Sequence, residues 1–163
     1  MGSRDIGVRH VVPGDVASLA DLVSEWKNHE QEAHMIRVGT LRHLHEYRIA
    51  RDGSRDVGWL KGHHEQPTMW QRVRGFEGKP EGWLCSFLAS LFVTEAERGH
   101  GVATALLDAF ENEARDQGNS LVMVSPDASE FGLEERLREF YGKRGYYLPE
   151  AKAGNSFLLA KSL

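Results

Sequence analysis

The stretch LFVTEAERGHGVATALLDAF, residues 91–110, joins an apolar run to an amphipathic helix through the segment Arg98-Gly99-His100-Gly101. The first N–H groups of a helix have no partner within it, and the helix dipole is positive at that end. Glycines carry no Cβ atom, so an anion can approach those donors closely. The segment therefore predicts either an ordinary strand-to-helix turn or a seat for a phosphate group, with the guanidinium of Arg98 as a further donor.

Two other glycine-rich nucleotide motifs do not fit this stretch. A P-loop requires Gly-Lys followed by Ser or Thr, whereas Val102 and Ala103 follow Gly101. A dinucleotide-binding fingerprint requires a small residue where Thr104 stands, and several more parallel strands after it. Both nucleotide-binding folds are therefore disfavoured.

Composition predicts one water-soluble globular domain, residues 1–163. The 163 residues are 40% hydrophobic and 27% charged, which suits a single substantial core. No apolar run approaches the roughly 20 residues of a membrane span, and the N-terminus has no signal-peptide core, so we expect a cytoplasmic protein with no membrane partner. A formal net charge of −4 disfavours nucleic acid as a partner. Cys85 is the single cysteine, and its apolar neighbours predict a buried, inert thiol.

Hydrophobic periodicity predicts the order of the elements. We expect helices over residues 16–27, 40–50, 101–117 and 133–143. We expect strands over residues 6–12, 56–61, 69–76, 83–93, 120–125, 146–148 and 156–160. Asp15 stands at the N-cap position of the first helix, and Gly118 stands just after the third.

The connections between these elements predict the fold class. Residues 65–68 and 77–82 are turn-like, which favours an antiparallel meander. The later strand–helix–strand order favours a right-handed parallel crossover. We therefore predict an α/β (or α+β) domain with a mixed, mostly antiparallel central sheet of about six to seven strands, flanked by helices on both faces.

Two motifs resemble a known family. Arg98-Gly99-His100-Gly101-Val102-Ala103 matches the R/Q-x-x-G-x-G/A signature of the GNAT superfamily of acyl-CoA-dependent N-acyltransferases. SLFVTEAERGHGVATALL resembles its fourth strand, loop and third helix, and LREFYGKRGYY resembles its later F-Y-x-K-x-G-F/Y segment. The resemblance carries specific motifs from residue 83 to residue 163 and rests on element order alone before that. It implies a single GNAT-like domain.

The resemblance also implies where the acyl donor, acetyl-CoA, binds. In this family the coenzyme A pyrophosphate lies on the amides at that helix start, and pantetheine inserts beside the fourth strand. Carried over, the cofactor-binding residues are Leu91, Phe92, Val93, Arg98, Gly99, His100, Gly101, Val102, Ala103 and Thr104. The amide near Phe92 or Val93 is expected to polarise the thioester carbonyl. His100 occupies a variable position and is expected to face solvent, and no metal is implied.

For catalysis, the resemblance assigns to Tyr141 the protonation of the departing thiolate. On spacing alone, Phe140 and Tyr141 also fit an aromatic pair on the buried side of a helix. The sequence departs from the family nearby, because Glu134 and Leu137 stand where relatives often have Asn and Ala. Recognition near the cofactor thiol is therefore expected to differ.

A general base is harder to assign. An ammonium nucleophile must lose a proton before it attacks, but the predicted fourth strand carries no carboxylate. The candidates that stay open are Glu81, His63, His64 and Asp127. An unusually acidic substrate ammonium needs no base at all.

The resemblance places acceptor recognition in the first helices, where the sequence is acidic and rich in histidine. SEWKNHEQEAHMIRV and LRHLHEY, residues 24–38 and 41–47, fit a wall for a cationic amine or a solvated polar face. A metal site at His43 and His45 is not expected, because i,i+2 residues on a helix point apart.

The resemblance implies an N-acetyltransferase that moves acetyl from acetyl-CoA to a primary amine by direct attack through a tetrahedral intermediate. A small-molecule amine is the favoured acceptor. The alternatives are a protein lysine or N-terminus, or a non-catalytic acyl-CoA-binding regulatory module. Acylation of aminoacyl-tRNA is disfavoured because the sequence has no basic cluster. Phe157-Leu158-Leu159 on a terminal strand is a candidate edge for a homodimer.

Overall fold

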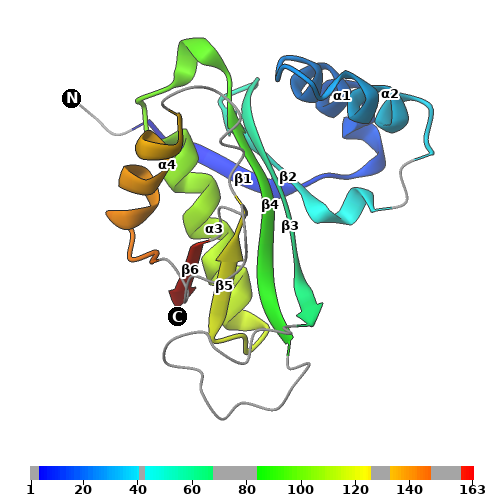
Figure 1. The fold of residues 1–163 in the computed structure, drawn as a ribbon. Coiled ribbons are helices and arrows are strands. Elements are labelled where there is room, and N and C mark those ends of the chain that lie inside the picture. Colours follow the sequence, from blue (N-terminus) through cyan, green and yellow to red (C-terminus); the bar gives the residue numbers. More distant parts are fainter. Residues whose placement is uncertain (1–3, 41–42, 68–83, 126–132, 148–158) are drawn as a thin grey trace. The chain divides into compact units, whose positions relative to one another are not determined.

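The computed structural model describes residues 4–40, 43–67, 84–125, 133–147 and 159–163. The strands are β1 (Ile6–His10), β2 (Tyr47–Asp52), β3 (Arg55–Pro67), β4 (Leu84–Val93), β5 (Leu121–Val124) and β6 (Leu159–Ser162) (Figure 1). The helices are α1 (Val16–Ser24), α2 (Glu30–Arg37), α3 (Val102–Asp116) and α4 (Leu133–Gly142), with short 3₁₀ turns η1 (Pro13–Asp15), η2 (Leu44–Glu46) and η3 (Glu95–Glu97).

The six strands form one sheet in the order β1-β2-β3-β4-β5-β6. The pairs β1–β2, β2–β3 and β5–β6 are antiparallel, whereas β4 and β5 are parallel, as a strand–helix–strand connection through α3 requires. The predicted α/β class with a mixed, mostly antiparallel sheet is therefore confirmed.

Contacts along the chain define two compact units. The first comprises residues 1–61 and 91–110, and the second comprises residues 62–90 and 111–163. Strands β3 and β4 and helix α3 each pass from one unit into the other.

In the first unit, α1 and α2 lie side by side and pack on one face of β2 and β3 (Figure 1). Alternate strand residues supply this layer, because successive side chains of a strand point to opposite faces. Its largest fully buried members are Leu19, Val23, Ile36, Tyr47, Ile49 and Trp59.

The other face of the same strands packs against the first half of α3. The guanidinium of Arg48 lies 5.1 Å from the ring centroid of Phe110. At Gly58, the side chains of Val102 and Leu106 come so close that a Cβ there would lie 3.0 and 3.2 Å from their methyl groups. Helices therefore cover both faces of the strands in this unit, as predicted.

Gly58 is expected to be intolerant of any side chain. A Cβ at this position would lie 2.8 Å from the backbone oxygen of Phe92, a distance that requires backbone movement. We expect Gly58→Ala to lower the free energy of unfolding by about 1–3 kcal/mol, the usual cost of overpacking. Urea unfolding measures this. Gly7→Ala on β1 is the matched control, because nothing lies within 4 Å of a Cβ there, and an equal loss in both variants contradicts the prediction.

In the second unit, β5 is buried along its whole length. Cys85 packs against Leu121, Met123 and Ala160, which confirms the expected buried thiol. Burial raises the pKa of that thiol to about 11, so it stays protonated at neutral pH. Glu111 is a buried carboxylate of α3, and Lys161 of β6 neutralises it at 2.6 Å.

The predicted helix over residues 40–50 is wrong. The second helix is α2, which begins at Glu30, and residues 44–46 form the 3₁₀ turn η2 that leads into strand β2. The apolar residues of this segment follow period 2, since Tyr47 and Ile49 enter the α1–α2 layer while Arg48 faces α3. Long side chains on both faces hid that alternation in the sequence.

Asp15 precedes α1 as expected, but its side chain makes no capping hydrogen bond to that helix. Its two oxygens accept hydrogen bonds from Arg9 at 2.6 Å each, and one also accepts from the amide of Val12 at 2.9 Å. The Arg9 guanidinium lowers the pKa of Asp15 to about 2. Asp15 therefore fastens β1 to the turn before α1.

Other boundaries differ by a few residues or fall outside the described chain. Residues 65–67 continue β3 rather than turn, and the first strand ends at His10. The C-terminal strand spans Leu159–Ser162 and pairs with Tyr147 through an isolated bridge to Ala160. The strand predicted over residues 69–76, and Phe157 and Leu158 of the candidate dimer edge, lie outside the described residues.

Gly118 follows α3 with φ +79°, as a left-handed C′ residue should. Among the described helices, none combines the length and apolar character that a bilayer span requires.

Candidate functional site

The turn between β4 and α3 is shaped by two glycines. Gly99 has φ +82° and Gly101 has φ +86°, in the left-handed region that side chains with a Cβ rarely adopt. Apart from the adjoining residues, no atom of the described part of the chain lies within 4 Å of the place a Cβ would occupy at either residue. The amide of Ala105 donates to the oxygen of Gly101 at 3.0 Å, so α3 begins directly after this glycine. The turn therefore leaves open space beside the N-terminus of a 15-residue helix.

The loop before the glycines is firmly held. The amide of Thr94 donates to the oxygen of Val57 at 3.0 Å, which ties the end of β4 to β3. Glu97 is buried, and its carboxylate pairs with the guanidinium groups of Arg4 and of Arg55, the latter at 3.0 Å. These bonds fix the backbone that leads into the glycine turn.

The guanidinium group of Arg98 is held through one face of its plane and through its Nε atom. Its guanidinium lies 5.6 Å from the ring centroid of Phe92, and its Nε–H donates to the oxygen of Val93 at 3.1 Å. Within the described part of the chain, its Nη groups make no hydrogen bond or ion pair. Those groups form a fork of donors beside the helix start.

The structure gathers all of the predicted cofactor-binding residues into the first unit. Arg98, Gly99, His100 and Gly101 are exposed, while Phe92, Val93 and Val102 are buried. Leu91, Ala103 and Thr104 are half-buried. His100 faces solvent as expected. A buried strand end, an open glycine turn and a helix N-terminus therefore follow one another along the chain.

Tyr141 lies on α4 in the second unit and is 2% exposed. Its ring makes edge contacts with Phe140 and Tyr146, at centroid distances of 5.0 and 5.3 Å. Burial raises its pKa, while the charge of Arg144 lowers it to a smaller extent. The hydroxyl has no hydrogen-bond partner among the described residues, and it stays protonated at neutral pH. The protonated, unpaired hydroxyl can donate a proton, while its raised pKa makes it a weaker acid than an exposed tyrosine.

The histidine candidates for a general base are engaged with neighbours. His63 Nε2 lies 2.9 Å from Gln66 Oε1. His64 Nδ1 lies 2.7 Å from the hydroxyl of buried Ser86, and its Nε2 lies 3.6 Å from a carboxylate oxygen of Glu113. Both ring nitrogens of His64 thus have polar partners inside the second unit. Glu81 and Asp127 lie outside the described residues.

A cluster that the sequence only hinted at surrounds the ring of Trp26. His29 stacks on it at 4.2 Å, Phe92 stacks on it at 5.4 Å, and Trp59 tilts against it at 5.7 Å. Glu32 borders these rings and hydrogen-bonds His29. The His-x-x-Glu spacing at the start of α2 was the available signal, because i,i+3 residues meet on a helix.

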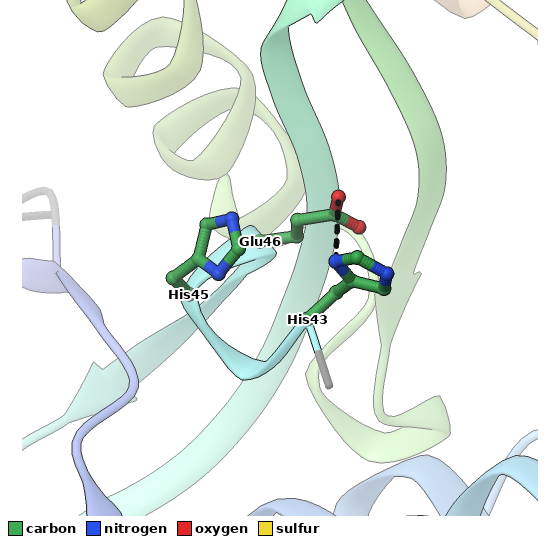
Figure 2. A group of neighbouring side chains, drawn as sticks. All are labelled: His43, His45 and Glu46. Carbon is green, nitrogen blue, oxygen red and sulfur yellow. Dashed lines mark ion pairs between the residues drawn. The ribbon is translucent and has the colours of Figure 1, made fainter. Parts of the chain in front are cut away.

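His43, His45 and Glu46 form a second polar group, shown in Figure 2. The reason for not expecting a metal here is wrong, because these residues lie on or beside the 3₁₀ turn η2 rather than on an α-helix. One ligand atom from each lies within 4.8 Å of the others, and His43 Nδ1 is 3.9 Å from Glu46 Oε1. Imidazole and carboxylate are ligands of zinc, but both histidines are exposed to competing water.

Comparison with protein families agrees with the resemblance carried by the glycine turn. The model of the acetyltransferase (GNAT) family matches residues 17–146. The chain belongs to the GNAT acetyltransferase family.

Solved structures show that this GNAT chain shares its fold with known members. The GCN5-related N-acetyltransferase from Rhodopseudomonas palustris matches with TM-score 0.62 at 19% identity, covering 100% of this chain and 99% of that one. The PaiA N-acetyltransferase from Thermoplasma acidophilum, in complex with coenzyme A, matches with TM-score 0.64 at 15% identity, covering 98% and 99%.

A third structure is larger than this GNAT chain. N-acetylglutamate synthase from Neisseria gonorrhoeae, complexed with coenzyme A and L-arginine, matches with TM-score 0.59 at 18% identity, covering 97% of this chain and 33% of that one. Comparison with curated proteins gives no significant match.

Proposed function

We propose that this GNAT chain is an acetyl-CoA-dependent N-acetyltransferase that acts on a primary amine of a small molecule. The observation that carries the proposal is the open glycine turn at the start of α3. Gly99 and Gly101 present backbone without Cβ atoms, and among the described residues only their chain neighbours lie within 4 Å of the Cβ positions. A pyrophosphate is an anion suited to such a helix N-terminus.

In this proposal the coenzyme lies along the first unit. The pyrophosphate accepts hydrogen bonds from the amides that open α3, among them those of Val102 and Ala103, and from the Nη groups of Arg98. The backbone of residues 91–93 pairs with pantetheine, and an amide near Phe92 or Val93 polarises the thioester carbonyl. Two similar solved structures, PaiA and N-acetylglutamate synthase, contain coenzyme A, which supports this donor.

The proposed reaction is direct attack without a covalent enzyme intermediate. Cys85 is fully buried and its pKa is raised to about 11, so it is a poor nucleophile. Tyr141, held neutral by burial, is the proposed acid that protonates the departing thiolate. We further propose that residues 1–163 act as one GNAT domain.

Thiol release tests the proposed function. Acetyl-CoA and a panel of primary amines are mixed with the protein, and free thiol is followed with a chromogenic reagent. Because Cys85 is buried, it should add little background. We expect thiol release that requires both the protein and an amine. Coenzyme A binding by calorimetry without release for any amine supports a regulatory module instead, and no binding contradicts the donor site.

A further inference from the structure

The turn between α1 and α2 brings two rings together. The amide of His29 donates to the oxygen of Trp26 at 3.1 Å, which closes a four-residue turn. Asn28, inside this turn, has φ +72°, a left-handed conformation that no other non-glycine residue adopts in the described part of the chain. The two ends of the turn therefore stack, with ring centroids 4.2 Å apart and planes 17° from parallel.

Glu32 sets the tautomer of His29. A carboxylate oxygen of Glu32 lies 2.9 Å from His29 Nδ1, so this nitrogen carries the proton and donates it to the carboxylate. The lone pair of the neutral ring is then on Nε2, which has no partner among the described residues. The His29 side chain is 19% exposed, so it is held in place and can still be reached from outside.

His29 and Glu32 form a dyad that lies beside the end of β4, where an amide near Phe92 or Val93 is proposed to polarise the thioester. Trp26 and Trp59 each contact both His29 and Phe92, at centroid distances between 4.2 and 6.4 Å. All four residues belong to the first unit, together with the glycine turn. Trp59 Nε1 is a buried donor without a hydrogen-bond partner in the described chain.

We infer that His29 is the general base that takes a proton from the acceptor amine, with Glu32 as its positioning partner. The inference rests on the proposed transferase function. In such a His–carboxylate pair, the carboxylate orients the ring and stabilises the imidazolium that forms.

Several charged groups face this dyad from neighbouring elements. On β2, the hydroxyl of Tyr47 donates to Glu32. On β3, Lys61 Nζ lies 3.7 Å from Glu32 Oε1, the oxygen that accepts from Tyr47, and 5.4 Å from the Tyr47 ring centroid. The guanidinium of Arg98 lies on the ring of Phe92. Glu32 is thus shared between imidazole, phenol and ammonium, which fixes the carboxylate in place beside His29.

The acceptor nitrogen loses two protons as the ammonium becomes an amide. The acceptor R–NH₃⁺ gives one proton to His29 Nε2, and the freed lone pair forms the C–N bond to the thioester carbon. Collapse of the tetrahedral intermediate breaks the C–S bond, and the nitrogen loses a second proton. Tyr141 gives its proton to the coenzyme sulfur and is reprotonated with the second proton from the nitrogen, while the first proton leaves to solvent from His29.

The test is the pH profile of kcat/KM for an amine that the wild-type protein acetylates. General-base catalysis typically contributes about 10²–10⁴-fold, so we expect His29→Gln and His29→Phe to lose at least about 100-fold. They should also lose the rise in rate on the acid side that follows deprotonation of the imidazole. His29→Phe keeps an aromatic ring on Trp26, which separates loss of the base from loss of packing.

Controls distinguish this role from a structural one. His10→Gln changes an exposed histidine of β1, outside the segments considered for acceptor recognition, and should keep the wild-type profile. All variants should bind coenzyme A with unchanged affinity in calorimetry. An acid-side rise and rates within about threefold of wild type in either His29 variant overturn the inference while the transferase stands. No turnover by the wild-type protein with any amine overturns both.

Discussion

Replacing Gly101 with valine is expected to abolish coenzyme A binding. Gly101 has φ +86°, where a β-branched residue is strained, and its missing Cβ leaves the helix start open. Loss of two charge-assisted hydrogen bonds to phosphate costs about 3 kcal/mol or more, which raises Kd at least about a hundredfold. Isothermal titration calorimetry with coenzyme A measures the change.

Gly118→Val is the matched control for that experiment. Gly118 has φ +79°, and nothing lies within 4 Å of the place a Cβ would occupy, so valine meets the same backbone strain at the far end of α3. Both variants should lose similar stability in thermal unfolding, but only Gly101→Val should lose affinity. Wild-type affinity in Gly101→Val, or an equal loss in both variants, contradicts the phosphate seat.

Replacing Tyr141 with phenylalanine is expected to lower kcat by about 10²–10⁴-fold, the usual contribution of a positioned acid. The hydroxyl makes no hydrogen bond among the described residues, so its removal should change the free energy of unfolding by less than about 1 kcal/mol. Burial raises the pKa of Tyr141 above its ordinary value of about 10. At any pH under about 10, ionisation of this hydroxyl should therefore cause no loss of the wild-type rate. Steady-state kinetics and urea unfolding measure the two effects.

Tyr146→Phe provides the opposite pattern. The hydroxyl of Tyr146 donates to Glu111 at 3.3 Å, so its loss should cost about 1 kcal/mol of stability and leave kcat unchanged. If Tyr141→Phe turns over at the wild-type rate, the thiolate is protonated by another group. If both variants lose kcat equally, a general disturbance of the aromatic cluster explains the loss.

The glycine turn could be predicted because its chemistry is local. Backbone conformation at Gly99 and Gly101 depends mainly on the residues themselves, and the helix that follows has a clear apolar stripe. The parallel crossover followed from the order of strand, helix and strand. Both features are encoded within about forty neighbouring residues, from the start of β4 to the end of β5, so no distant contact was needed to predict them.

The region before β3 could not be predicted in the same way. Residues 44–50 resemble a helix because Leu44 and Tyr47, three residues apart, can share a helical face, whereas Tyr47 and Ile49 share one face of a strand. Pairing of Ile49 with Trp59 and of Ala50 with Gly58, and the packing of α1 and α2 over them, decides for β2. Such strand propensity depends on cross-strand neighbours rather than on the chain itself.

The family could be predicted from the sequence alone, and the residues proposed to bind an anion and to act as the acid could be named from it. Only the tertiary structure decided which titratable groups meet. His64 faces Ser86 and Glu113, distant residues that no spacing connects to it, whereas the His29–Glu32 pair becomes significant through the rings of Trp59 and Phe92. The physical reason is that a glycine turn is set by local torsions, while the environment of a side chain is set by packing between segments far apart in the chain.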